Sequence, residues 1–309
     1  MRKLKFICQL LIAFIIASLG YNIFYEPHQE TVRAAVRQQF NQAGGAGQEA
    51  GGQLKITMLD VGHGDAILLS TAGRNVMIDT GDSRNLAQLE EGLARAQVKR
   101  VHTVFVTHHH EDHMGNTLKV AGKYGVSRIY DSGYPNARNA NSVRLNQVLR
   151  AGNYNNRALR AGDTVYLGKN YYVEVLSPDA SLSRELAANL NNTSLVMLLH
   201  YGSFTMLFMG DAEKEIEGLL AEKYGARLKA DILKVGHHGS RTSSIYRLTS
   251  RVKPAYALIS CGPFELYHHP NKNVVGSLRH LGARVLTTAD NGSITVLTDG
   301  QSFRVETEK

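Results

Sequence analysis

At 309 residues with 43% hydrophobic side chains, the chain is long enough to bury a substantial core, as one large domain or two small ones. The 35 Lys and Arg residues exceed the 27 Asp and Glu residues, and the resulting charge of +8 mildly favours anionic partners such as nucleic acid, phosphate esters or lipid headgroups. The two cysteines, Cys8 and Cys261, form no CxxC pair, which argues against a disulfide framework and a thiolate zinc site. Any metal ion must therefore be held by histidine and carboxylate side chains.

The sequence pattern of residues 1–25 predicts a membrane segment. Arg2, Lys3 and Lys5 form a positive flank, and the apolar run from Phe6 to Tyr25 can cross a hydrocarbon core of about 30 Å at about 1.5 Å per residue. A cleaved signal peptide is the alternative, and in both cases the positive flank stays cytoplasmic and the rest of the chain is exported. We therefore expect a domain outside the membrane, which is anchored there or secreted if the segment is cleaved.

Residues 26–52 differ in kind from the apolar run before them. They end in QAGGAGQEAGG, which is rich in Gly, Ala and Gln without an apolar period and is typical of a flexible tether. The sequence therefore places a domain boundary near Gln53 and predicts one folded domain over residues 53–309.

From Leu54 onward, short apolar runs alternate with helical patterns. The first three runs, LKITMLD, AILLS and NVMID, predict successive strands with Gly-rich turns between them. Later strands are predicted for VHTVFVT, ADILKVG, AYALIS, ARVLTT and SITVLT, and a hairpin for SLVMLLHYGSFTMLFMGD, turning at residues 201–203. Helices are predicted over residues 86–97, 115–124 and 213–224. Consecutive strands followed by β-α alternation in both halves indicate an α/β fold of two packed sheets with helices outside.

The segment THHHEDHMGN follows the strand VHTVFVT and has the spacing H-x-H-x-D-H. His108 and His110, two residues apart in extended backbone, point their imidazoles the same way, toward one metal ion. Asp112 and His113 lie on the turn into the next helix and can reach a second ion about 3.5–4 Å away. Neutral imidazole and carboxylate ligands suit Zn²⁺, Mn²⁺ or Fe and leave coordination positions open for water.

THHHEDHMGN resembles the signature motif of the metallo-β-lactamase superfamily. The segments MLDVGHGDAILL, VMIDTGD, NNTSLVMLLHYGSFTMLFMGD, ADILKVGHHGSRTSS and YHHP, in this order, are similar to the extracellular hydrolase domain of ComEC-type DNA-uptake proteins. The resemblance covers about residues 54–305 and implies an αββα sandwich of two mixed sheets. Because the chain lacks the many membrane helices of those proteins, we expect a stand-alone relative.

The resemblance also implies a ligand set for one or two divalent ions, Zn or Mn. It comprises His108, His110, Asp112, His113, Asp211 as the bridging aspartate, and one residue of the pair His237-His238. We favour His238, with His237 behind it, because only one of two adjacent residues at a strand end can point inward. Asp79 matches an aspartate that orients the ligand loop. Asp211 has an alternative role, as the cap of the helix that begins near Glu213.

The chain departs from the superfamily pattern where a third histidine is expected before the bridging aspartate. A hairpin turning at residues 201–203 puts Asp211 opposite Asn192 or Thr193, with Ser194 next, and makes His200 a solvated turn residue. NNTS therefore replaces the third histidine, and one metal position should be weaker. We place Asn192 and Ser194 behind the ligands.

Three more residues are candidates for substrate contact. His63 stands where ComEC relatives usually have Gln, which adds an imidazole at the rim, and Ser240 follows the histidine pair. His269, before Pro270, can donate a proton to a leaving group or hold a phosphate oxygen, or it can simply cap a turn.

These residues predict hydrolysis by a metal-activated water that Asp112 orients or deprotonates. A phosphodiester substrate, including single-stranded DNA, follows from the family resemblance alone, since no nucleic-acid-binding module is recognisable. Hydrolysis of another ester, a thioester or a lactam on the same fold is one alternative. A tethered binding protein with a degenerate site is the other.

Overall fold

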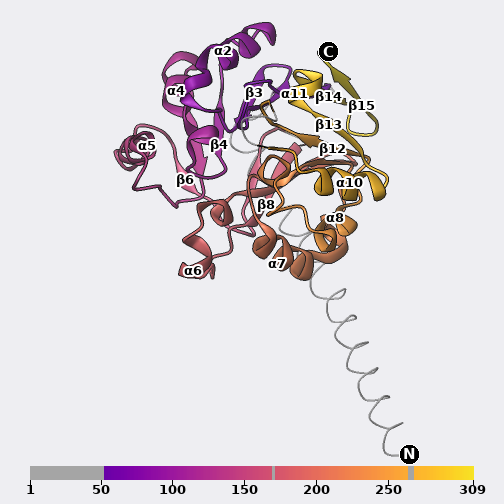
Figure 1. Cartoon of the computed structure of the whole chain (residues 1–309). Helices are drawn as coiled ribbons and strands as arrows, with labels where there is room; N and C mark the ends of the chain where they lie inside the picture. Colours follow the sequence, from indigo (N-terminus) through magenta and orange to yellow (C-terminus); the bar gives the residue numbers. More distant parts are fainter. Residues whose placement is uncertain (1–51, 169–170, 264–267) are drawn as a thin grey trace, which may run out of the picture. The chain divides into compact units, whose positions relative to one another are not determined.

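Two β-sheets pack face to face in the computed structural model, which describes residues 52–168, 171–263 and 268–309 (Figure 1). The predicted membrane segment over residues 1–25 and the tether, apart from Gly52, lie outside the described residues. Within the described part of the chain, no helix combines the length and the apolar character needed to cross a bilayer.

The first sheet has eight strands in the order β15-β14-β1-β2-β3-β4-β5-β6. Pairing is antiparallel from β15 to β3 and parallel from β3 to β6, so the sheet is mixed. Its strands are β1 (Leu54–Met58), β2 (Ile67–Thr71), β3 (Arg74–Ile78), β4 (Thr103–Val106), β5 (Arg128–Asp131), β6 (Arg157–Ala158), β14 (Ile294–Thr298) and β15 (Phe303–Thr307).

The second sheet has seven strands in the order β13-β12-β11-β10-β9-β8-β7. The strands from β10 to β13 are parallel, and β7 to β10 are antiparallel. Its strands are β7 (Thr164–Tyr166), β8 (Tyr171–Ser177), β9 (Val196–Tyr201), β10 (Phe204–Phe208), β11 (Ile232–Lys234), β12 (Tyr256–Ile259) and β13 (Arg284–Thr287).

Alternating side chains of both sheets build the central core. Ile56 of β1 and Phe105 of β4 meet Met197, Met206 and Phe208 of the second sheet in one buried cluster. Full burial of such a side chain contributes about 1.5–3 kcal/mol, so the two inner faces stabilise each other strongly. The two-residue period also sends every second side chain outward, toward the helices.

Helices cover both outer faces. On the first sheet, Leu89, Leu93, Val120 and Leu145 pack over outward residues such as Met77. On the second sheet, Ile216, Leu248 and Leu278 do the same. The helices are α2 (Leu86–Arg95), α3 (Glu111–Met114), α4 (Thr117–Tyr124) and α5 (Ala140–Arg150) on the first side, and α7 (Lys214–Tyr224), α8 (Tyr246–Val252) and α10 (Lys272–His280) on the second, with the short α6 (Arg184–Ala187) and α11 (Thr288–Asn291) in connections.

This architecture is the predicted sandwich of two mixed sheets with helices outside. The predicted hairpin is present as β9 and β10, but Tyr201 pairs with Phe204, so the loop holds only Gly202 and Ser203. Gly202 has φ of +59°, as a two-residue hairpin turn requires. This pairing shifts the expected register by one residue.

Candidate metal centre

The carboxyl ends of four strands carry the candidate ligands. β4 leads into the segment Thr107–Asn116, β3 into Asp79, β10 into Asp211 and β11 into the turn Gly236–Gly239. β3 and β4 belong to one sheet and β10 and β11 to the other, so the site is assembled between the carboxyl ends of inner strands from both sheets.

His108 and His110 face each other at the start of the ligand loop. Nε2 of His108 lies 3.0 Å from Nδ1 of His110, and the two rings are nearly perpendicular. Burial lowers the pKa of both imidazoles, so both are neutral near pH 7. Two neutral ring nitrogens directed at the same point are suited to binding one cation.

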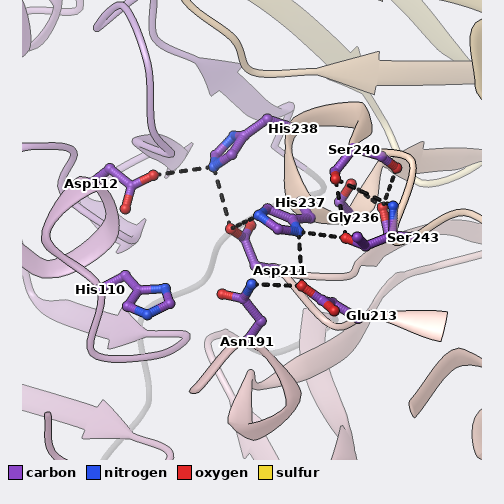
Figure 2. Close-up of polar contacts among 12 residues, drawn as sticks. His110, Asp112, Asn191, Asp211, Glu213, Gly236, His237, His238, Ser240 and Ser243 are labelled. Atoms are coloured by element: carbon purple, nitrogen blue, oxygen red, sulfur yellow. Dashed lines mark hydrogen bonds and ion pairs between the residues drawn. The ribbon is translucent and has the colours of Figure 1, made fainter. Parts of the chain in front are cut away.

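A second group lies beside this pair and consists of Asp112, His113, Asp211 and His238, whose ligand atoms all lie within 4.8 Å of one another. Asp211 Oδ2 is 3.2 Å from His113 Nε2 and 3.4 Å from His238 Nε2. Asp112 Oδ2 is 3.3 Å from His238 Nε2, so His238 links the two carboxylates (Figure 2). The structure thus brings together side chains from around residues 110, 211 and 238.

The charges of the group fit a divalent cation. Burial alone would lower the pKa of His238, but Asp211 and other carboxylates outweigh it and raise the pKa to about 10. Burial would raise the pKa of Asp211, yet the rings of His113 and His238 lower it well below its usual range. His113 Nε2, His238 Nε2 and Asp211 Oδ1 are buried without a hydrogen bond of normal geometry. Without a cation, the carboxylates therefore favour protonated rings beside them; a divalent cation would supply this positive charge instead, and the imidazoles would release their protons to become the nitrogen donors that Zn²⁺, Mn²⁺ or Fe²⁺ uses.

Asp79 holds the ligand loop from behind, as the sequence resemblance implies. Its carboxylate accepts hydrogen bonds from the Thr107 backbone N–H (2.7 Å), the Thr107 hydroxyl (2.6 Å) and His113 Nδ1 (2.8 Å). Asp79 itself has φ of +58°, which aims its side chain across the end of β4. The hydrogen bond places the proton of His113 on Nδ1 and leaves Nε2 to face Asp211 and the metal position.

The other face of the ligand loop is bound to helix α5 and strand β5. His109 Nδ1 lies 2.8 Å from Ser142 Oγ, and its Nε2 lies 3.0 Å from Asp131 Oδ2. Glu111 accepts hydrogen bonds of 2.8 Å from the side-chain amides of Asn139 and Asn141. Residues 108, 110 and 112 therefore face the metal group, while 109 and 111 anchor the loop.

Lys234, which was not predicted from the sequence as a site residue, is a buried cation next to the ligand group. Its ammonium contacts the Asp65 carboxylate, donates to the Gly210 carbonyl (3.1 Å) and lies 3.9 Å from Asp211 Oδ1. Asp65 Oδ1 in turn lies 3.7 Å from His238 Nδ1. The signal in the sequence is a lysine within the strand ADILKVG, where the pattern otherwise requires apolar residues.

Both histidines of the pair turn toward Asp211, so the argument that only one of them can point inward is wrong. They lie in the turn Gly236–Gly239 after β11, not on the strand, and both have left-handed backbone with φ of +47° (His237) and +51° (His238). His237 Nε2 lies 3.9 Å from Asp211 Oδ2, and its Nδ1 lies 3.3 Å from Glu213 Oε1 (Figure 2). The same Nδ1 also contacts Thr242 Oγ1 (3.0 Å). His238 is the member that the close ligand group contains.

The hairpin register moves the residues expected opposite Asp211. Ser194, not Asn192 or Thr193, is its neighbour, because the Asp211 N–H donates to Ser194 Oγ (3.1 Å). The Asn192 side chain instead accepts from the Glu213 N–H (3.1 Å). His200 lies in β9 with its ring 4.7 Å from that of Tyr172, so it is a partly buried strand residue and not a solvated turn residue.

Histidines also line the rim. The ring of His63 lies 4.5 Å from that of His238 and 5.9 Å from that of His269, and His63 Nε2 is 3.7 Å from Asp112 Oδ2. Burial and the neighbouring His238 lower the pKa of His63 to about 3 and of His269 to about 4. Ser240 lies in its own turn, 3.0 Å from Thr242 Oγ1.

A family model described as the metallo-beta-lactamase superfamily matches residues 59–262, which include the ligand loop, Asp211 and His238. The chain therefore belongs to the metallo-β-lactamase superfamily.

Among curated proteins, it is similar to bacterial competence and recombination proteins. ComE operon protein 3 of Bacillus subtilis is 29% identical over 262 residues, covering 78% of this chain and 32% of that protein. Recombination protein 2 of Haemophilus influenzae is 31% identical over 252 residues, covering 78% of this chain and 28% of that protein. Competence protein ComA of Neisseria gonorrhoeae is 28% identical over 243 residues, covering 77% and 31%. The chain spans about a third or less of the length of these relatives.

Solved structures show the same fold. The metallo-beta-lactamase fold protein YhfI from Bacillus subtilis superposes with a TM-score of 0.54 at 13% identity, over 80% of this chain and 100% of that one. CmlA, a diiron beta-hydroxylase from Streptomyces venezuelae, gives a TM-score of 0.51 at 18% identity, over 79% and 53%. At these identities the likeness concerns the fold alone.

Proposed function

We propose that this metallo-β-lactamase-superfamily protein is a metal-dependent phosphodiesterase, acting on DNA or other phosphate esters outside the membrane. The observation that carries the metal dependence is the buried group Asp112, His113, Asp211 and His238, with His108 and His110 beside it. Support for a nucleic-acid substrate comes from the relatives whose names refer to competence and recombination. Support for export comes from the apolar segment over residues 1–25.

A divalent cation bound by this group supplies positive charge for the developing oxyanion and lowers the pKa of a water molecule. Asp112 is suited to orienting that water, because its side chain is 23% exposed whereas those of His113, Asp211 and His238 are 3% exposed or less. Burial raises the pKa of Asp112, but His113 and His238 outweigh burial and lower it below its usual range. A carboxylate this weakly basic holds a hydrogen bond from water better than it removes a proton.

His269 and His63 are suited to holding the phosphoryl oxygens as neutral hydrogen-bond donors. With a pKa of about 4, only about one His269 side chain in a thousand is protonated at pH 7. Of the two substrate-directed roles of His269, binding a phosphate oxygen is therefore favoured over donating a proton.

The test is hydrolysis of single-stranded DNA and of bis-p-nitrophenyl phosphate by the purified full-length chain, after chelation and reloading with Mn²⁺ or Zn²⁺. We expect metal-dependent turnover that His110→Ala abolishes. His200→Gln is the matched control, because His200 packs on Tyr172 away from the ligand group and should retain activity. Full activity in His110→Ala, or a wild-type protein that takes up no metal, would overturn the proposal.

A further inference from the structure

Asn191 is a buried amide with one satisfied and one unsatisfied end. It lies in the 3₁₀ turn Leu190–Thr193 before β9, and only 7% of the residue is exposed. Its Nδ2 donates to Glu213 Oε1 at 2.9 Å, which determines the orientation of the amide. The opposite atom, Oδ1, is buried and makes no hydrogen bond of normal geometry.

The unsatisfied oxygen is directed into the ligand group. Figure 2 shows the amide between His110 and Asp211, with its nitrogen toward Glu213 and its oxygen toward His110. The Asn191 side chain also contacts His110, but without the geometry of a normal hydrogen bond. The turn before β9 therefore places an oxygen acceptor beside the His108–His110 pair.

A buried amide oxygen without a partner costs about 1–3 kcal/mol, so a partner is expected at this position. The same position faces two neutral imidazoles that converge within 3.0 Å of each other. Asp211 Oδ2 lies 3.2 Å from His113 Nε2, and the ring of His113 lies 4.2 Å from that of His108, so the carboxylate belongs to the group beside this pair. A cation between His108, His110 and Asp211 would be the missing partner.

We propose that the amide oxygen of Asn191, together with His108, His110 and Asp211, would hold a second cation. Asn191 then takes the place of the third histidine that most members of the superfamily have. Replacing an imidazole by an oxygen donor favours Mn²⁺ over Zn²⁺ at this position. A neutral amide is also a weaker ligand than imidazole, so this cation binds second. This inference rests on the metal-binding part of the proposed function.

The test measures the two Mn²⁺-binding steps of the full-length chain by titration calorimetry, with electron paramagnetic resonance to detect a coupled Mn²⁺ pair. Asn191→Leu removes the oxygen at similar volume. We expect the second step to weaken by about tenfold or more and the coupled signal to disappear, while the first step is unchanged. Asn75→Leu is the matched control, because Asn75 lies near the start of β3, at the opposite end from the candidate ligands, and its side chain donates to the Arg100 carbonyl (2.9 Å), so both steps should stay intact.

A second variant tests the same point without removing the oxygen. Asn191→Asp combined with Glu213→Gln keeps the total charge and allows the hydrogen bond between the two side chains to form with reversed polarity. A carboxylate at position 191 should tighten the second Mn²⁺ step by about tenfold or more.

Two results would overturn the assignment of Asn191. One is an unchanged second step in both variants, and the other is an equal weakening of both steps in a folded Asn191→Leu protein. A wild-type chain that binds no metal would instead overturn the proposed function itself, so the two failures are distinguishable.

Discussion

Replacing Asp79 by asparagine alters the hydrogen bonding of His113, a candidate metal ligand, without changing any of the candidate ligands themselves. In the native protein, Asp79 accepts three buried hydrogen bonds, two from Thr107 and one from His113 Nδ1. An asparagine has one oxygen, which must accept from the Thr107 backbone N–H, and its NH₂ group then faces His113 Nδ1. To accept that hydrogen bond, His113 must carry its proton on Nε2, the nitrogen 3.2 Å from Asp211 that faces the metal position.

The size of the effect follows from these contacts. Losing a hydrogen-bonding partner that orients a ligating histidine typically lowers metal affinity about 10- to 100-fold, which corresponds to about 1.4–2.7 kcal/mol. The metal-free protein is also destabilised, by about 1–3 kcal/mol, because at least one buried polar group loses its charged partner. Both effects have the same direction, but they are measured separately.

Calorimetric metal titration and urea unfolding of the metal-free protein separate the two effects. Thr107→Val is the comparison: it removes the hydroxyl contacts to Asp79 (2.6 Å) and to His108 Nδ1 (3.2 Å) but leaves the Asp79–His113 bond, so it should lose stability and lose less metal affinity than Asp79→Asn. Wild-type metal affinity in a folded Asp79→Asn protein would refute the assignment of the His113 tautomer.

Three further predictions concern pH and backbone conformation. The folded-state pKa of His238, about 10, lies above the ordinary value of 6.5, so the metal-free protein loses stability as the pH rises from about 6.5 to 10. Mn²⁺ should therefore raise the melting temperature more at pH 8.5 than at pH 6.5. An equal rise at the two pH values would contradict this. The folded-state pKa of Glu217 is raised by burial to about 7, so its contribution to stability is lost between about pH 4.5 and 7, and Glu217→Gln should flatten that part of the urea-unfolding profile. Gly64→Ala should lower stability and metal affinity, because the new Cβ would collide with the Asp112 carbonyl. Gly73→Ala, also at positive φ but with open space around it, should lower stability only slightly. Equal losses in the two variants would argue against the collision.

Much of the first ligand cluster could be predicted from the sequence because spacing determines its geometry. His108 and His110 are two residues apart after a buried strand, so their convergence required no knowledge of distant contacts. Asp211 could be placed because FMGD matches the family motif, and in the structure Gly210, at φ of +52°, turns the chain between the end of β10 and Asp211. The strands over residues 54–78 and 294–298 were equally visible, since their apolar alternation is regular.

Other features depend on contacts or conformations that the pattern does not reveal. The left-handed backbone of His237 and His238 is rare for non-glycine residues, so a strand geometry was expected and proved wrong. The register of the β9–β10 hairpin depends on whether its loop has two or three residues, and a shift of one residue was enough to exchange Thr193 for Ser194 opposite Asp211. Helix α5 was not predicted, and its role in anchoring the ligand loop became visible only in three dimensions.

The division of the ligand loop into two faces has a consequence for how its sequence can change. Even-numbered positions from 108 to 112 carry the candidate metal ligands, and positions 109 and 111 supply the anchors to β5 and α5. Inserting or deleting a single residue here would exchange the two faces and direct the anchors inward, so the loop tolerates changes of identity at the anchor positions far better than changes of length. Variation in related chains should accordingly appear as substitutions at 109 and 111, with matching changes at 131, 139, 141 and 142, and not as gaps.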